Sequence, residues 1–295
     1  MIIAGGSFRP PHLVGEVPPS PHGHDALRAV ETRNDSYPFG QLAGAWSTRN
    51  PPLFGKMGAM SPIVGHIAEL WCYPVKSLGG QQLSEVSCGR RGFDGDRRWA
   101  VRGADGKLGS GKTTRRFRRM PGLLSMASLV DEHGVAWIRL ADGESRRIDD
   151  PMTAALIGAV VGEDVTLVKE GEMSHFDDAP LHLVSTASLR WLEERRPIDQ
   201  VDRRRFRPNL VVEREGSDLA EDGWLGRRLQ IGDVTVKVEK RTERCVMTTL
   251  AQDDLRFAPA ILGDLHKANE SCLGVYARVV SEGTIRLGDD VVLCC

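Results

Sequence analysis

Short segments in which apolar and polar residues alternate recur along most of this chain, and they limit the folds it can adopt. The first runs from Ile63 towards Pro74, which ends it because proline has no amide hydrogen for a strand ladder. Further strands are expected at residues 83–88, 98–102, 123–130, 135–140, 165–169, 181–184, 207–212, 228–231, 234–240, 274–280 and 285–293. Mostly short strands with few helices predict a barrel-like, mostly β member of the α+β class.

Two helices interrupt this pattern. Asp150 and Pro151 form a start signal, because aspartate caps the free amides of a first turn and proline fits the first helical position. This helix is expected to end at Gly162, and a second one is expected to run from Thr186 towards Pro197.

The first 60 residues differ from the rest, because proline, glycine, serine and histidine break any regular period. Such a segment is expected to be disordered or loosely attached. Met57 and Met60 directly precede the first strand pattern, so the hypothesis arises that translation starts there. The expected division is a leader at 1–60, a β-rich domain at 61–148 and a second domain at 149–295.

The most chemically informative segment is the hairpin of residues 228–240, whose second strand runs on to Cys245. Arg244 precedes this cysteine, and Thr248 and Thr249 follow it, which makes a polar setting. A guanidinium beside a thiol favours the thiolate, the form that attacks electrophiles and binds metals. The alternative is that Cys245 only fills space in the core, as free cysteines often do.

Composition narrows the classes of partner. A net charge of −1 excludes a general binder of polyanions such as nucleic acid, but basic residues crowd into 90–102, 107–119 and 203–207. These clusters are either sites for a local anion or solvated faces. The six cysteines include no C-x-x-C pair, and no signal peptide or membrane-spanning run is recognisable, so a reduced, cytoplasmic protein without membrane contact is expected.

One motif invites a wrong conclusion. Residues 106–113, GKLGSGKT, fit the phosphate-binding loop pattern of nucleotide hydrolases. That loop must cap a helix that crosses back to a parallel strand, and Pro121 and Gly122 leave too little room for one. We therefore expect the motif to lie on a hairpin, where Lys112 and residues 115–119 form a basic edge.

Four short motifs in order resemble the MOSC-domain family, in the branch of the amidoxime-reducing component and its bacterial relatives. They are Tyr73-Pro74-Val75-Lys76-Ser77, Asp96-Arg97-Arg98-Trp99, Phe206-Arg207-Pro208-Asn209 and Arg244-Cys245-Val246-Met247-Thr248-Thr249. The resemblance covers residues 63–295 and implies an N-terminal MOSC β-barrel domain joined to a MOSC β-barrel domain. The resemblance also implies pyridoxal phosphate binding, as a property of the family as a whole.

The resemblance implies a molybdenum–pterin cofactor with Cys245 as the metal ligand, and thiolate is a soft donor that suits a sulfur-rich site. The residues that it implies around the cofactor phosphate and pterin are Lys76, Ser77, Arg97, Asp178, Arg207, Asn209, Arg244 and Tyr276. Arginine is favoured for forked contacts to phosphate oxygens.

The expected activity is reduction of small N-hydroxylated or N-oxide compounds. Because no flavin or iron–sulfur motif is recognisable, electrons are expected from a separate flavin or iron–sulfur protein. The family often shows T-T-x-D-P after the cysteine, whereas Ala251 stands at the acidic position here. A protein that carries the cofactor or sulfur without turnover, and a metal-free enzyme with Cys245 as nucleophile, remain alternatives.

Overall fold

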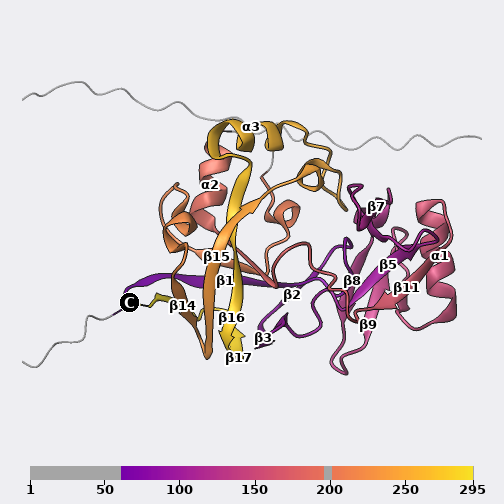
Figure 1. Ribbon diagram of the computed structural model, residues 1–295, viewed down its shortest axis with the longest axis horizontal. Helices are drawn as coiled ribbons and strands as arrows, with labels where there is room; N and C mark the ends of the chain where they lie inside the picture. Colours follow the sequence, from indigo (N-terminus) through magenta and orange to yellow (C-terminus); the bar gives the residue numbers. More distant parts are fainter. Residues whose placement is uncertain (1–60, 196–200, 295) are drawn as a thin grey trace, which may run out of the picture. The chain divides into compact units, whose positions relative to one another are not determined.

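The computed structural model describes residues 61–195 and 201–294, so the predicted leader at 1–60 lies outside the described residues. Its largest feature is a closed barrel (Figure 1). The seven barrel strands are β1 (Ile63–Cys72), β12 (Leu181–Ser185), β13 (Leu210–Glu213), β14 (Arg228–Ile231), β15 (Val234–Glu243), β16 (Cys272–Ser281) and β18 (Asp290–Leu293).

The barrel closes because β13 pairs with β12 on one side and with β1 on the other. The order is β13, β12, β16, β15, β14, β18 and β1, and β1 pairs back onto β13 through His66–Glu213 and Leu70–Leu210. Only the β12–β13 pair is parallel among these seven strands. A closed barrel leaves none of its strands with a free edge, which removes a common route to aggregation.

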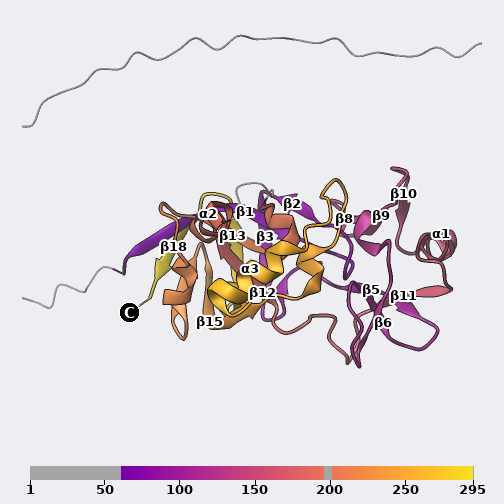
Figure 2. The same cartoon turned by 90° about the horizontal axis from the view of Figure 1, so that it is seen from above.

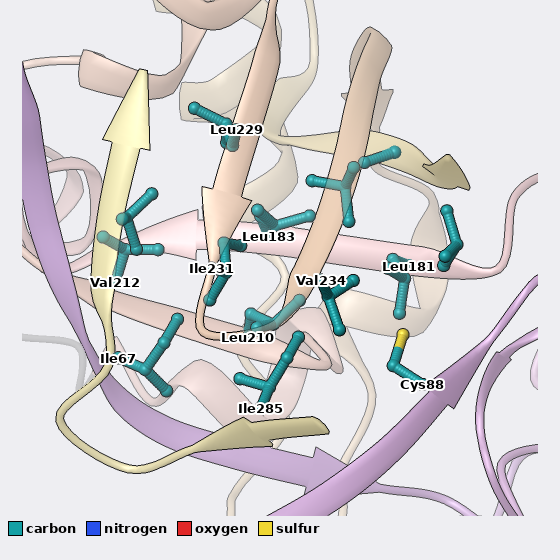
Figure 3. Packing of buried hydrophobic residues seen from close by; sticks show 14 of the residues in the cluster. Ile67, Cys88, Leu181, Leu183, Leu210, Val212, Leu229, Ile231, Val234 and Ile285 are labelled. Carbon is teal, nitrogen blue, oxygen red and sulfur yellow. The ribbon is translucent and has the colours of Figure 1, made fainter. Parts of the chain in front are cut away.

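Alternation along the strands fills the barrel with aliphatic side chains. Leu183, Leu210, Val212, Leu229 and Ile231 are fully buried and belong to one cluster (Figure 3). The residues between them point to the opposite face of the strand, as the period of two requires, where Gln230 is partly exposed and Val211 packs into the helix cluster. This interior is therefore a packed core.

Two helices cover one side of the barrel. Helix α2 (Thr186–Arg195) and helix α3 (Ala260–Asn269) lie near each other in Figures 1 and 2, and Leu192 and Ile261 share one core cluster with Val184 and Val211. The sequence pattern predicted α2 but not α3. The reason is that Pro259 stands at its N-cap, where no side chain caps the helix.

Of the remaining strands in the described chain, β2 extends the large sheet beside β1, and the others form three smaller sheets. They are β2 (Gln81–Leu83), β3 (Glu85–Gly89), β4 (Gly92–Phe93), β5 (Trp99–Gly103), β6 (Leu108–Ser110), β7 (Phe117–Arg119), β8 (Ala127–Val130), β9 (Ala136–Arg139), β10 (Ser145–Arg147), β11 (Val165–Lys169) and β17 (Gly283–Arg286). Helix α1 (Pro151–Val161) packs beside β11 (Figure 2), with Asp150 accepting a hydrogen bond from the Met152 amide as expected. The predicted division at residue 148 stays a prediction.

Four strand boundaries differ from expectation, each for a local reason. Predicted strand 83–88 splits at Ser84, because β2 pairs with β1 whereas β3 pairs with β17. Predicted strand 123–130 begins as the 3-10 turn η1 (Leu123–Ser125) after Gly122. Predicted strand 207–212 starts only at Leu210, because Arg207 is left-handed with φ 52°. Predicted strand 285–293 divides into β17 and β18 around Gly288, which has φ 84°.

The GKLGSGKT motif does not precede a helix. Strand β6 pairs antiparallel with β5, and the chain then loops past Lys112 into β7, which pairs parallel with β6. The prediction of a hairpin position is therefore confirmed for residues 106–110, which lie on the β5–β6 hairpin, and wrong for residues 111–113, which lie in the loop between the parallel strands β6 and β7. The helix N-terminus that a phosphate-binding loop requires is missing from this described segment.

Gly274 in β16 gives a test of barrel packing. A Cβ atom there would lie 2.4 Å from His182 Nε2 and 2.5 Å from the Leu183 carbonyl oxygen, at φ +79°. We expect Gly274→Ala to lower the free energy of unfolding by about 3 kcal/mol, from backbone strain and overpacking together. Gly143→Ala is the control, because φ is +91° there but nothing lies within 4 Å of the added atom. If both variants lose the same free energy of unfolding in denaturant titrations, the close contact with His182 is not the reason for glycine at position 274.

Candidate functional site

The motifs that are far apart in sequence meet in one cavity of about 100 Å³. All of the predicted site residues except Asp178 line it. The lining residues are Lys76, Ser77, Arg97, Lys112, His175, Phe176, Asp177, Ala179, His182, Arg205, Phe206, Arg207, Asn209, Glu243, Arg244, Cys245, Met247 and Tyr276. Six of these carry a guanidinium or ammonium group and two carry a carboxylate, so the cavity has an excess of positive charge.

Cys245 lies where strand β15 passes into the 3-10 turn η4 (Val246–Thr249). The hydroxyls of Thr248 and Thr249 donate to the carbonyl oxygens of Cys245 and Val246, at 2.9 and 2.7 Å. They therefore hold the turn together, and the polar setting of the thiol comes from Arg244 and the other cavity residues.

The other cysteines of the described residues do not line this cavity. Cys72, Cys88 and Cys272 are buried. Burial raises the pKa of the Cys88 thiol to about 12, and it raises the pKa values of Cys72 and Cys272 as well. These three thiols match the core-filling reading that was the alternative for Cys245, whereas Cys245 is only partly buried and borders a polar cavity.

Three cavity residues adopt left-handed backbone conformations. Ser77, Arg97 and Arg207 have φ values of 69°, 48° and 52°, and only three other non-glycine residues of the described chain have positive φ. Such conformations cost free energy and persist where the surrounding structure enforces them, often at functional sites. The backbone is thus bent at three of the positions that the motifs singled out.

Arg97 and Arg207 both lie over the ring of Tyr73, with guanidinium carbons 4.5 and 4.3 Å from its centroid. Arg97 also forms an ion pair with the fully buried Asp96, and it donates to Asn209 Oδ1 at 3.2 Å. Arg207 has no carboxylate partner among the described residues. Burial, together with the nearby charge of Arg97, lowers the pKa of Arg207 to about 10.

An ion pair between the buried Lys76 and the more exposed Asp177 joins two segments that line the cavity. Lys76 Nζ donates to Asp177 Oδ1 at 2.8 Å and lies 4.3 Å from the centroid of the Phe117 ring. Burial lowers the pKa of Lys76, and Asp177 opposes this effect. Burial acts to raise the pKa of Asp177, but the Lys76 ammonium and its hydrogen bond outweigh burial and lower it.

Asp178, which the sequence analysis named, does not line the cavity. Its carboxylate pairs with Lys240 Nζ at 2.5 Å, and the residue borders a neighbouring depression instead. The adjacent Asp177 points its carboxylate to Lys76. Sequence spacing could not choose between these neighbours, because both lie in an irregular loop where side-chain direction has no fixed period.

The guanidinium of Arg244 contacts groups on two segments. Its Nη2 donates to the Phe206 carbonyl at 2.7 Å, and its Nη1 lies 3.4 Å from His182 Nε2. The His182 ring is buried and lies 5.7 Å from the Tyr276 ring. Burial, and then the charge of Arg244, lowers the pKa of His182 well below its ordinary value, so the ring is neutral and can accept a hydrogen bond.

The carboxylates that follow Ala251 do not replace the missing acidic residue within the cavity. Asp254 accepts from Arg204 Nη1 at 2.8 Å, and Asp253 borders a different depression. Ala251 itself lies beside Gly111 and Leu250, outside the cavity lining. The carboxylates that do line the cavity are Asp177 and Glu243.

Two domain models match the chain. The MOSC domain matches residues 170–292, and the MOSC N-terminal beta barrel domain matches residues 64–176. Together they cover most of the sequence, in the order that the motifs predicted. The chain belongs to the MOSC-domain family.

Its curated relatives include mitochondrial amidoxime-reducing component 1 of Homo sapiens, 25% identical, with 84% of this chain and 87% of the relative aligned. The Mus musculus protein of the same name is 28% identical, with 78% and 82% aligned. Because these relatives are named as mitochondrial, the predicted cytoplasmic location stays a prediction. Within residues 61–195 and 201–294, no helix combines the length and apolar character needed to cross a bilayer.

Solved structures give more distant likenesses. The YuaD protein from Bacillus subtilis is 11% identical with a TM-score of 0.40, and the alignment covers 78% of this chain and 94% of that one. YiiM from Geobacillus stearothermophilus is 23% identical with a TM-score of 0.32, over 45% and 64% of the two chains. Scores this low carry no structural argument, so the assignment rests on the two domain models.

The unpaired charge of Arg207 predicts a stabilising substitution. Because a partly buried guanidinium without a carboxylate partner lowers stability, we expect Arg207→Met to raise the free energy of unfolding of the ligand-free protein by about 1 kcal/mol. Methionine keeps a flexible side chain against Tyr73. Arg204→Met is the matched control, because its guanidinium is bonded to Asp202 and Asp254. A loss of stability in Arg207→Met as large as in the control would contradict the expectation.

Proposed function

We propose that this protein reduces N-hydroxylated or N-oxide compounds with a molybdenum–pterin cofactor, and that Cys245 is the protein ligand of molybdenum. The observation that carries the proposal is one cavity that contains a partly buried thiol and an excess of cations. The names of the curated relatives describe reduction of amidoximes, which are N-hydroxylated compounds.

The cations fit the anionic part of such a cofactor. Arg207 has no carboxylate partner among the described residues, and Arg244 Nε is buried without a hydrogen-bond partner. A buried charged group without an ion-pair or hydrogen-bond partner lowers stability unless a bound ligand supplies that partner. A phosphate would supply the missing acceptors, and arginine forks suit its oxygens. Lys76, Ser77, Arg97 and Asn209 are proposed to share this phosphate and pterin site.

Asn209 and Ser77 already use part of their hydrogen-bonding capacity within the protein. Asn209 Oδ1 accepts from Arg97 and from the His182 amide, and its Nδ2 donates to the Trp71 carbonyl. The Ser77 hydroxyl donates to the Gly109 carbonyl at 3.1 Å. Asn209 therefore has one side-chain N–H left for a ligand, and Ser77 has the lone pairs of its hydroxyl and its backbone amide.

When bound, the cofactor supplies the redox chemistry, and the protein supplies binding and electrostatics. Reduction of an N–OH group takes up two electrons and two protons, breaks the N–O bond and releases water. A separate flavin or iron–sulfur protein is proposed as the electron donor. Arg244 and Tyr276 are proposed to orient the ligands beside Cys245, because both line the cavity and burial keeps the Tyr276 hydroxyl protonated by raising its pKa.

Metal and pterin analysis of protein from a cofactor-competent host, followed by an assay with reduced viologen and benzamidoxime, tests the proposal. Molybdenum, pterin and turnover together support it. Bound cofactor without turnover of any N-hydroxylated compound would leave the cofactor-carrier alternative. Thiol-dependent activity without metal would instead favour a nucleophilic Cys245.

Cys245→Ser separates metal ligation from packing. A hydroxyl is a poor substitute for a soft thiolate, so we expect the reduction rate per bound pterin to fall by at least about 100-fold, which corresponds to about 2.7 kcal/mol. The melting temperature should stay close to that of the wild type, because the side chain is only partly buried. Cys294→Ser is the control, since Cys294 is also partly buried but does not line the cavity. A destabilised Cys245→Ser variant with normal turnover per cofactor would rule out ligation.

Arg207→Met also tests the proposed phosphate contact. Loss of one charge-assisted hydrogen bond costs about 1.5 to 3 kcal/mol, so we expect the dissociation constant of the cofactor to rise about 10- to 100-fold. Pterin and molybdenum retained after gel filtration report this change. Undiminished retention in a folded variant would show that Arg207 does not contact the cofactor.

A further inference from the structure

The loop between β6 and β7 brings a lysine into the cavity that none of the family motifs contains. Lys112 belongs to the GKLGSGKT segment, whose resemblance to a phosphate-binding loop the fold does not support. Its side chain nevertheless lines the same cavity as Cys245. The segment therefore has a position at the site without the helix that nucleotide binding would require.

The loop is anchored to the turn that carries Cys245. Ser110 Oγ lies 3.5 Å from Met247 Sδ, two residues beyond the cysteine. A Cβ atom on Gly111 would lie 2.9 Å from Met247 Cγ and 2.7 Å from Leu250 Cδ1, so the backbone is packed tightly against η4. Lys112 follows directly, which places its backbone next to the Cys245 turn.

Lys112 has no hydrogen bond or ion pair among the described residues. Its Nζ lies 5.8 Å from the centroid of the Phe117 ring, a face that Lys76 also approaches. The charge of Lys112 acts on Asp177, and that carboxylate is already bonded to Lys76 at 2.8 Å. An ammonium in this position remains available to an incoming anion.

We propose that Lys112 binds an anionic group of the substrate, so that the preferred substrates are N-hydroxylated compounds that also carry a carboxylate or phosphate. This inference rests on the proposed function. The phosphate and pterin contacts are assigned to other residues, whereas Lys112 enters the cavity from the loop that packs against the Cys245 turn, so we assign it to the substrate. The positive excess of the lining adds to the attraction for an anion.

The test compares two substrates that differ by one charge, benzamidoxime and 4-carboxybenzamidoxime, with cofactor-loaded protein and reduced viologen. Wild type should show a higher kcat/KM for the carboxylated compound. Lys112→Ala should lower that value about tenfold, mainly through KM, and leave the value for benzamidoxime within about twofold, as loss of one charged contact implies. Lys112→Arg should retain the preference.

Lys107→Ala is the matched control, because Lys107 lies in the turn between β5 and β6, at the other end of β6, and outside the cavity lining. Equal effects of Lys112→Ala on both substrates, or on neither, would overturn the inference. Equilibrium titration of the oxidised enzyme with 4-carboxybenzamidoxime gives a second readout, with about tenfold weaker binding expected for Lys112→Ala. If neither compound is reduced, the proposed function fails, while this titration still decides whether Lys112 binds the carboxylate.

Discussion

The cavity depends on the way Asn209 joins three strands at the point where the barrel closes. Its amide donates to the His182 carbonyl at 2.8 Å, and its carbonyl accepts from the Trp71 amide at 2.9 Å. Its side chain bonds to His182, Trp71 and Arg97 as well. One buried residue thus continues β13 by one position before its regular start, where it bonds to β1 and β12, and it positions Arg97 at the same time. Barrel closure and site geometry therefore share the same hydrogen bonds.

Electrostatic conflict at the site has a structural origin. Lys76, Arg207 and Arg244 have pKa values lowered by burial, which means that the fold holds these cations where water solvates them poorly. Asp96 and Asp177 neutralise part of this charge through Arg97 and Lys76. Since the remainder is unbalanced within the described residues, stability and anion binding oppose each other here, as they often do at functional sites.

Local sequence patterns predicted the parts of this structure that local chemistry determines. The Asp150 cap, the Gly162 end of α1 and the hairpin that leads to Cys245 each depend on residues close together in the chain. The residues that the motifs did not identify, including Asp177, His182 and Lys112, lie in a loop, a strand and a hairpin end that meet only in three dimensions. Gly274 is a sequence feature linked to His182, because the imidazole occupies the space that a side chain at position 274 would fill.

The site requires both regions that the domain models match. Lys76, Arg97 and Lys112 come from the N-terminal match, whereas Arg207 and Cys245 come from the MOSC match. Strand β1, from the N-terminal match, is also one of the barrel strands, since it pairs with β13 and β18. Removing the N-terminal region would therefore open the barrel as well as remove half of the cations from the cavity. The β6–β7 loop, in contrast, carries Lys112 but contributes no strand to the barrel. Exchange of this loop alone would therefore change a proposed substrate contact without opening the barrel.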